Sequence, residues 1–266
     1  MRPRTLEDFL ISRPLTVDGI LDDGWGAPFP VKGVEIDATI LYADISDFTA
    51  RSTELSAVET LAYVNNFFAW VTAEALTGRA AIVDKYIGDE IMVVFSKEFG
   101  SEDPFVDAVQ AARWMAENDA LSFRPHMGLA SGSVVIGYVG TPLLFGCSVF
   151  GRPVAVANRC TSAGLLDDIE GMVFASITFP AHEWGGRELT DVLTPVRYSG
   201  PDGKEHEQPL AWDLQGPGEV AMKGLGDVQV CQLVSRMFHA PMTSAEERVK
   251  EGVADLRKYG YYRGRS

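Results

Sequence analysis

The chain has 266 residues, of which 46% are hydrophobic and 23% charged, and its formal net charge is −14. This length and composition are those of a globular protein with one large or two small domains. The acidic balance argues against a nucleic-acid or anionic-membrane partner, because binding their phosphates requires a basic face. A small phosphorylated substrate remains compatible, since a metal ion and a few cations can reverse the field inside a cleft.

The cysteines and the N-terminus predict a soluble cytoplasmic protein. Three widely spaced cysteines form no CxxC pair, and their odd number favours reduced thiols: Cys147, Cys160 and Cys231. The opening "MRPRTLEDFLISRP" is too acidic for a secretory signal, and no stretch approaches the roughly 20 apolar residues of a membrane span.

The first 75 residues predict a lead-in, a strand and a helix. Residues 1–35 mix Pro, Gly and Asp and are interpreted as an N-terminal lead-in segment. Residues 38–43, "ATILYA", have the length and composition of a strand. Residues 56–75 predict a helix with a capping box at Ser56 and Glu59, and with an apolar stripe of Leu61, Val64, Phe68 and Val71.

The rest of the chain continues the alternation of strands and helices. Residues 80–86 and 90–95 predict a hairpin whose tight turn carries Gly88 and Asp89. Further expected elements are a helix at 103–118, two short strands within 125–140, a helix at 154–166, strands at 171–179 and 228–234, a surface excursion at 198–218, and a polar C-terminal helix at 244–260. The order β-α-β-β-α-β predicts an α+β, ferredoxin-like fold with extra strands and a terminal helix.

Two acids stand out by their positions in this fold. Asp44 ends the first strand and Asp89 lies in the hairpin turn. In a ferredoxin-like sheet the first strand lies beside the hairpin, so both carboxylates can face one point. Converging carboxylates favour Mg²⁺ or Mn²⁺, which hold triphosphates for in-line displacement at phosphorus. The simpler alternative is that each acid caps a turn.

Four segments in order resemble the class III nucleotide cyclases, the adenylate and guanylate cyclase catalytic domain. They are "LYADISDFT", "DKYIGDEIMVVF", "HMGLASGSVVIGYVG" and "SVFGRPVAVANR". The resemblance covers roughly residues 36–235. It implies a nucleotide cyclase catalytic domain at 36–236, between the lead-in segment at 1–35 and a C-terminal helical tail at 237–266.

The resemblance implies a role for each matching residue. Asp44 and Asp89 would hold two Mn²⁺ or Mg²⁺ ions per active site, with the Ile45 carbonyl as an additional ligand. Arg159 would stabilise charge on the α-phosphate and the departing pyrophosphate, and Lys223 would reach the triphosphate. The backbone N–H groups of the loop after Asp44 would cradle the β- and γ-phosphates: Ser46, Asp47, Phe48 and Thr49.

The implied reaction is attack of a ribose 3′-hydroxyl on the α-phosphorus of a nucleoside triphosphate, giving a 3′,5′-cyclic nucleotide and pyrophosphate. In this family the acids and the arginine belong to opposite subunits. The resemblance therefore implies a head-to-tail homodimer with two shared active sites.

Three positions depart from the family pattern. Ala155 replaces the asparagine that orients the ribose, and Asn158, one helical turn away, is the candidate substitute. Lys85 matches the base-contacting lysine of adenylate cyclases, but its partner position, usually Asp or Thr, is Ser148. Asp47 replaces a common glycine, and we expect its carboxylate to cap the following helix.

These departures and the stretch "DGWGAPFPVKGVEIDATILYADISDFT" resemble the pyrimidine cyclases of bacterial antiphage (Pycsar) systems. That branch implies cyclic UMP or cyclic CMP as the product, acting on a separately encoded effector protein. We also expect no sensor, membrane or coiled-coil segment. The alternatives are an adenylate cyclase that makes cyclic AMP and a non-catalytic nucleotide-binding homologue. A diguanylate cyclase is disfavoured, because "YIGDE" has one glycine where that class has two.

Overall fold

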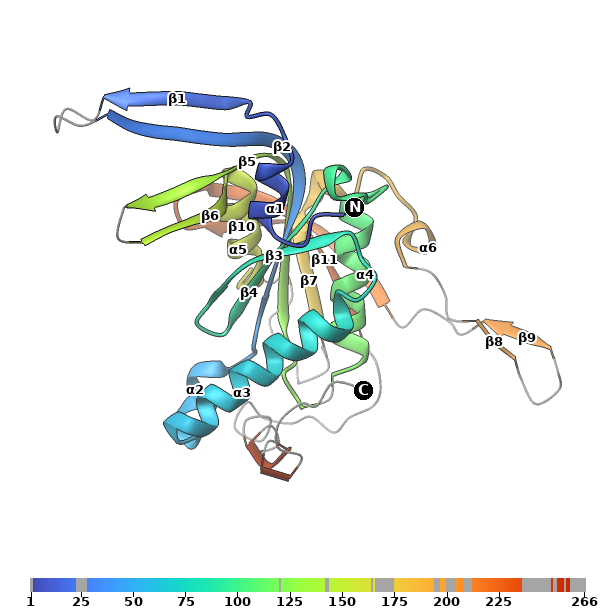
Figure 1. Cartoon of the computed structure of the whole chain (residues 1–266). Helices are drawn as coiled ribbons and strands as arrows, with labels where there is room; N and C mark the ends of the chain where they lie inside the picture. Colours follow the sequence, from blue (N-terminus) through green and yellow to red (C-terminus); the bar gives the residue numbers. More distant parts are fainter. Residues whose placement is uncertain are drawn as a thin grey trace.

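The computed structural model describes residues 2–22, 28–119, 121–141, 144–163, 165, 175–193, 197–199, 204–207, 212–235, 250, 253–255 and 257–258. Over these residues the main sheet has nine strands, and β8 and β9 form a separate pair (Figure 1). The strands are β1 (Val17–Asp22), β2 (Pro28–Asp44), β3 (Ala81–Ile87), β4 (Glu90–Phe95), β5 (His126–Thr141), β6 (Leu144–Phe150), β7 (Ala175–Pro180), β8 (Arg197–Ser199), β9 (Glu205–Glu207), β10 (Trp212–Met222) and β11 (Gly226–Ser235).

The helices lie between these strands along the chain. The α-helices are α1 (Leu6–Ile11), α2 (Phe48–Glu54), α3 (Ala57–Trp70), α4 (Pro104–Glu117), α5 (Arg152–Thr161) and α6 (Leu189–Val192). A π-helical turn, η1 (Val71–Ala75), follows α3, and the 3₁₀ turns are η2 (Lys97–Phe99) and η3 (Ala181–Glu183). None of the helices within the described ranges is long and apolar enough to span a membrane.

The ferredoxin-like prediction is confirmed. Neighbouring strands run in the order β5-β2-β4-β3, with α2 and α3 between β2 and β3 and with α4 between β4 and β5. The added strands extend the sheet beyond β5 in the order β7, β11 and β10, and β7 is parallel to β5.

Each face of the sheet carries its own hydrophobic core. Helices α3 and α4 cover one face, and α1 and α5 cover the other (Figure 1). Leu41 and Ala43 of β2 belong to the α3–α4 core, whereas Ile40 and Tyr42 belong to the α5 core. Because strand side chains alternate between faces, Asp44 falls on the face that α5 covers.

The capping box of the predicted helix is confirmed, and the predicted apolar stripe is confirmed only toward its C-terminal end, where Val71 is fully buried and Phe68 packs against the core. Ser56 and Glu59 exchange side-chain and backbone hydrogen bonds at the start of α3. Leu61, a stripe residue, is 64% exposed, and the buried residues of the helix are Tyr63, Asn66, Phe67 and Trp70. The large aromatic side chains decide the orientation, because they bury more apolar area than Leu or Val.

The strand predictions for the second half of the chain were incomplete. Residues 126–141 form one long strand, β5, in place of the two short strands expected within 125–140. Strands β6 and β10 were not predicted, and neither was β1 in the first half of the chain. Strand β10 begins at Trp212, inside the stretch 198–218 that was expected to be a surface excursion, and it has a bulge between Gln215 and Gly218. The proposed tail at 237–266 lies outside the described residues except for short pieces.

The glycines of β5 allow close packing; they do not mark turns. A Cβ atom at Gly128 would lie 2.2 Å from the Ala157 carbonyl oxygen and 2.6 Å from the Thr161 backbone nitrogen. Gly132 has φ +149°, a conformation that L side chains rarely adopt, and lies against Pro153. Helix α5 therefore rests directly on the β5 backbone, which fixes the position of the site residues that it carries.

We predict that Gly128→Ala destabilises the protein by about 3 kcal/mol, because the added methyl group has no space against the α5 backbone. The matched control is Gly146→Ala in β6, where no atom lies within 4 Å of the added Cβ. Urea unfolding of both variants measures the difference. Equal stabilities would show that α5 is not held against β5 in this way.

Candidate active site

A cavity of about 720 Å³ opens where β2 ends and β4 begins, beside α2. Asp44 and Glu90 are cross-strand partners at this edge of the sheet. Asp89 joins them from the β3–β4 turn. The lining residues are Asp44, Ile45, Asp47, Phe48, Thr49, Ala50, Thr53, Ile87, Asp89 and Glu90.

The carboxyl groups of Asp44 and Asp89 are in hydrogen-bond contact. Burial raises the pKa of the Asp44 carboxyl far above its usual range. The hydrogen bond and charge of Asp89 raise this pKa further, and the charge of Glu90 adds to the effect. The Ile45 backbone N–H opposes these contributions by donating to the Asp44 carboxylate. Two acids in contact require either a shared proton or a cation between them.

The donor chemistry of this pair fits a divalent cation. Asp44 and Asp89 offer hard carboxylate oxygens, and the Ile45 carbonyl adds a third oxygen of the kind that Mg²⁺ and Mn²⁺ prefer. Across the described ranges, no group of three or more His, Cys, Asp or Glu side chains converges as a ready-made metal cage. A cation here would therefore need oxygen atoms from a substrate or from water to complete its coordination.

The loop after Asp44 reaches the cavity through Asp47, Phe48 and Thr49. Ser46 does not line the cavity, because its backbone N–H and its hydroxyl both donate to the Phe123 carbonyl at 3.2 Å. The expectation that the Ser46 N–H contacts phosphate is therefore corrected: this donor is already engaged inside the chain.

Asp47 occupies the N-cap position of α2, but the predicted side-chain cap is absent. Its backbone has φ +53° and ψ +26°, the left-handed conformation. Asp and Asn adopt this conformation more readily than most residues other than glycine. The glycine that is common here in the family is therefore replaced by a residue that can keep the same backbone turn.

A buried arginine beneath the loop was missed by the sequence reading. Arg51 is fully buried and donates to the Ser46 hydroxyl at 3.1 Å, to the Tyr63 hydroxyl and to the Ser122 carbonyl. These bonds tie the loop and the start of α2 to the α3–α4 core. No sequence signal marked this residue, since an arginine at the end of a polar turn usually faces solvent.

Helix α5 brings Asn158 and Arg159 to the same edge of the sheet. The Asn158 side-chain amide donates to the Glu90 carboxylate at 3.1 Å, and Arg159 is exposed. Burial raises the pKa of Glu90, while the Asn158 hydrogen bond and the Arg159 charge oppose the rise. Glu90 was also missed, although its position beside Asp89 at the start of a strand was a usable signal.

Lys85 and Ser148 meet outside the cavity. The Lys85 ammonium donates to the Ser148 hydroxyl at 2.5 Å, and this hydroxyl donates to Asp84 at 3.0 Å. Asp84 was not anticipated from the sequence. Lys223 is exposed at the β10–β11 turn and does not line the cavity.

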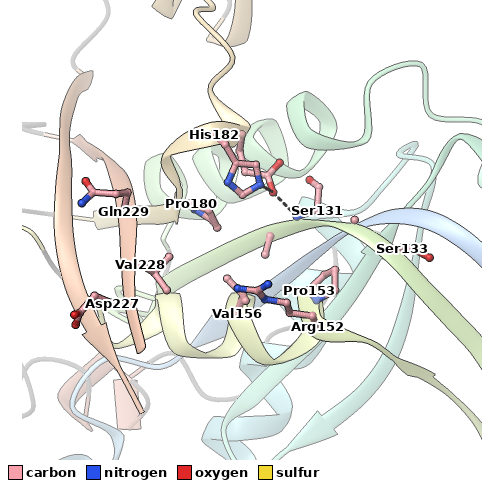
Figure 2. A pocket seen from close by; sticks show the side chains of 13 residues that line it. Ser131, Ser133, Arg152, Pro153, Val156, Pro180, His182, Asp227, Val228 and Gln229 are labelled. Carbon is pink, nitrogen blue, oxygen red and sulfur yellow. Dashed lines mark hydrogen bonds and ion pairs between the residues drawn. The ribbon is translucent and has the colours of Figure 1, made fainter. Parts of the chain in front are cut away.

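A second cavity, of about 540 Å³, lies at the opposite end of α5 (Figure 2). It is lined by Arg152, His182 and Glu183 among others, and the Glu183 carboxylate accepts a hydrogen bond from the Ser131 backbone at 2.6 Å. None of the residues singled out from the sequence lines it. The candidate active site is therefore the cavity at Asp44 and Asp89.

We predict that Asp89→Asn weakens Mn²⁺ binding roughly tenfold or more, because it removes one of two converging carboxylate ligands. Electron paramagnetic resonance of free Mn²⁺ during titration measures the affinity. The control is Asp37→Asn, an exposed acid on β2, which should bind Mn²⁺ as the unchanged protein does. Equal affinity in the two variants would contradict the assignment.

Comparison with known proteins agrees with the fold and with the position of the motifs. The family model for the adenylate and guanylate cyclase catalytic domain matches residues 33–173. An adenylate cyclase of Anabaena cylindrica is 30% identical over 154 residues, which cover 50% of this chain and 30% of that protein. The chain thus spans less than a third of the length of that relative.

Solved cyclase structures share the fold at low sequence identity. The adenylyl cyclase CyaB from P. aeruginosa aligns with a TM-score of 0.55 and 19% identity, over 80% of this chain and 99% of that one. The guanylate cyclase domain of RhGC from Catenaria anguillulae, solved with GTP, aligns with a TM-score of 0.55 and 20% identity, over 76% and 98%. The family match, which spans more than half of the chain, shows that this protein belongs to the adenylate and guanylate cyclase catalytic domain family.

Proposed function

We propose that the chain is a nucleotide cyclase that converts a ribonucleoside triphosphate to a 3′,5′-cyclic nucleotide and pyrophosphate. The observation that carries the proposal is the contact between the Asp44 and Asp89 carboxyls at the cavity edge. A half-buried pair of acids in contact is unfavourable without a cation, so it supports a site for metal-bound phosphate.

The residues around the pair suggest how the chain would position its substrate. Asp44, Asp89 and the Ile45 carbonyl would hold two Mn²⁺ or Mg²⁺ ions. When bound, such ions lower the pKa of the attacking hydroxyl and neutralise the triphosphate. The backbone of Asp47–Thr49, at the start of α2, would orient the β- and γ-phosphates. Positioning and electrostatics supply most of the acceleration in reactions of this kind.

A second copy of the chain would complete each site. Arg159 is exposed on α5, so its guanidinium can reach a substrate held by another chain. We propose that it stabilises the α-phosphate and the leaving pyrophosphate there, with Asn158 orienting the ribose in place of the residue lost at Ala155. Lys223, also exposed, is proposed to reach the triphosphate once two chains associate.

Exposed apolar side chains support the homodimer. Large apolar residues that are between 42% and 73% exposed include Val58 and Leu61 on α3, Tyr86 and Ile87 on β3, Val139 and Phe150 on β5 and β6, and Ile11 on α1. An interface between two copies of the chain would remove part of this apolar surface from water.

We favour a pyrimidine substrate, UTP or CTP, with the cyclic product acting on a separate effector protein in antiphage defence. The support is the altered base pocket: Ser148 stands where adenylate cyclases carry Asp or Thr, and it bonds directly to Lys85. ATP is the second candidate, favoured by the match to the Anabaena cylindrica adenylate cyclase. A non-catalytic homologue is the third, favoured by the substitution at Ala155.

Incubation with each of the four ribonucleoside triphosphates and Mn²⁺, followed by mass spectrometry, tests these candidates. We expect a 3′,5′-cyclic pyrimidine nucleotide and pyrophosphate, and a fall of roughly 100-fold or more in Asp89→Asn because the metal site is lost. Cyclic AMP as the dominant product would contradict the pyrimidine proposal. Absence of any cyclic product from a folded protein would support the non-catalytic alternative.

A further inference from the structure

A buried acid, Asp84, binds both residues that we propose to meet the base. Its side chain has no exposed surface, and its Oδ2 lies 3.2 Å from the Lys85 Nζ. The same oxygen accepts a hydrogen bond from the Ser148 hydroxyl at 3.0 Å. Lys85 also donates to that hydroxyl at 2.5 Å. The three side chains therefore form a closed triangle of charge-assisted hydrogen bonds.

The backbone of β3 is irregular where it forms this triangle. Neighbouring residues on a regular strand point to opposite faces, so Asp84 and Lys85 would not be expected to meet. A bulge between Val83 and Lys85, opposite β4, places one extra residue at this point. Bulges re-aim side chains and are common beside active sites. The bulge and the burial of a charged group both reduce the stability of the folded chain. Together they place the Asp84 carboxylate against the Ser148 hydroxyl.

One oxygen of the Asp84 carboxylate has no hydrogen-bond partner among the described residues. Within the described part of the chain, the Oδ1 atom of Asp84 is buried without a hydrogen-bond partner. A carboxylate kept only for stability is expected to satisfy both oxygens, because an unpaired buried acceptor is destabilising. The triangle reaches the surface through Lys85, whose side chain is 38% exposed.

Only one assignment of donors and acceptors satisfies the hydrogen bonds among Asp84, Lys85 and Ser148. A serine hydroxyl has one proton and two lone pairs, a carboxylate only accepts, and an ammonium only donates. The Ser148 proton therefore points to Asp84, and Lys85 occupies one Ser148 lone pair. One lone pair of Ser148 and one N–H of Lys85 remain. Toward a ligand, Ser148 can only accept and Lys85 can only donate.

We propose that Asp84 is a positioning residue that fixes the hydrogen-bond polarity of the base pocket, so that the site distinguishes bases with an exocyclic amine from bases with a carbonyl there. This inference rests on the proposed function, because it takes Lys85 and Ser148 as the base contacts. Cytosine presents an amine donor beside a ring acceptor, and uracil presents the reverse. In any one orientation, only one of the two matches a fixed donor and a fixed acceptor.

Without Asp84 the Ser148 hydroxyl is free to rotate and can donate or accept, so both bases are tolerated. The test measures binding of 3′-deoxy-CTP and 3′-deoxy-UTP with Mn²⁺, since these analogues lack the attacking hydroxyl and report recognition without turnover. We expect the unchanged protein to bind one analogue at least about tenfold more tightly, the effect of one mismatched hydrogen-bond pair. In Asp84→Ala, which leaves no acceptor for the Ser148 proton, the two affinities should fall within about threefold of each other.

The matched control is Asp18→Ala, which removes an exposed strand acid that pairs with Lys32 at 3.9 Å, and it should keep the original preference. If Asp84→Ala does not fold, Ser148→Ala should lose the preference and Ser148→Thr, which keeps the hydroxyl, should retain it. A folded Asp84→Ala or Ser148→Ala protein with the original preference would overturn the inference. So would an unchanged protein that binds neither analogue or binds both equally.

The same experiment separates this inference from the proposed function. If the analogues bind with a preference that depends on Asp84 but no triphosphate is cyclised, the base-reading triangle stands and only the cyclase activity is contradicted. If cyclic product forms while the preference is independent of Asp84, the activity stands and the role of Asp84 is wrong.

Discussion

The contact between the Asp44 and Asp89 carboxyls is the interaction on which the rest of the site depends. It exists because a central strand ends on an acid next to the turn of the neighbouring hairpin, and because the ferredoxin-like order places β2 beside β4. Burial makes two free negative charges there unfavourable. The pair is therefore stable either with a proton or with a cation, and the second state is the one that would recruit a triphosphate.

Buried contacts hold the loop after Asp44 and helix α5 in place around this pair. Arg51, fully buried, anchors the loop that follows Asp44. Helix α5 lies so close to β5 that Gly128 leaves no room for a methyl group. The Asn158–Glu90 hydrogen bond then joins α5 to the first residue of β4, next to Asp89 in the turn. One chain thus presents the acid pair in a cavity and an exposed Arg159 on its surface, two halves that suit completion by a second copy.

The sequence predicted the fold and the acid pair because both depend on local signals. Short stretches of sequence predict strand ends, the "IGD" turn and the Ser56–Glu59 capping box, and the structure has the hairpin and the cap where expected. Interactions between segments that are distant in the sequence could not be predicted in this way. Arg51 is buried by partners up to 71 residues away, and Asp84 meets Ser148 across 64 residues through a bulge that a period of two does not reveal. The buried face of α3 was predicted only in part, because the packing of Tyr63, Phe67 and Trp70 leaves Leu61 at the surface.

Mixing two inactive chains, Asp44→Ala and Arg159→Ala, tests most directly whether the acid pair of one chain works with the arginine of another. After verified subunit exchange, half of the dimers in an equal random mixture are mixed, and each mixed dimer has one intact site of two. We expect recovery of about a quarter of the unchanged activity. No recovery, or full activity in either variant alone, would contradict a site shared between two chains.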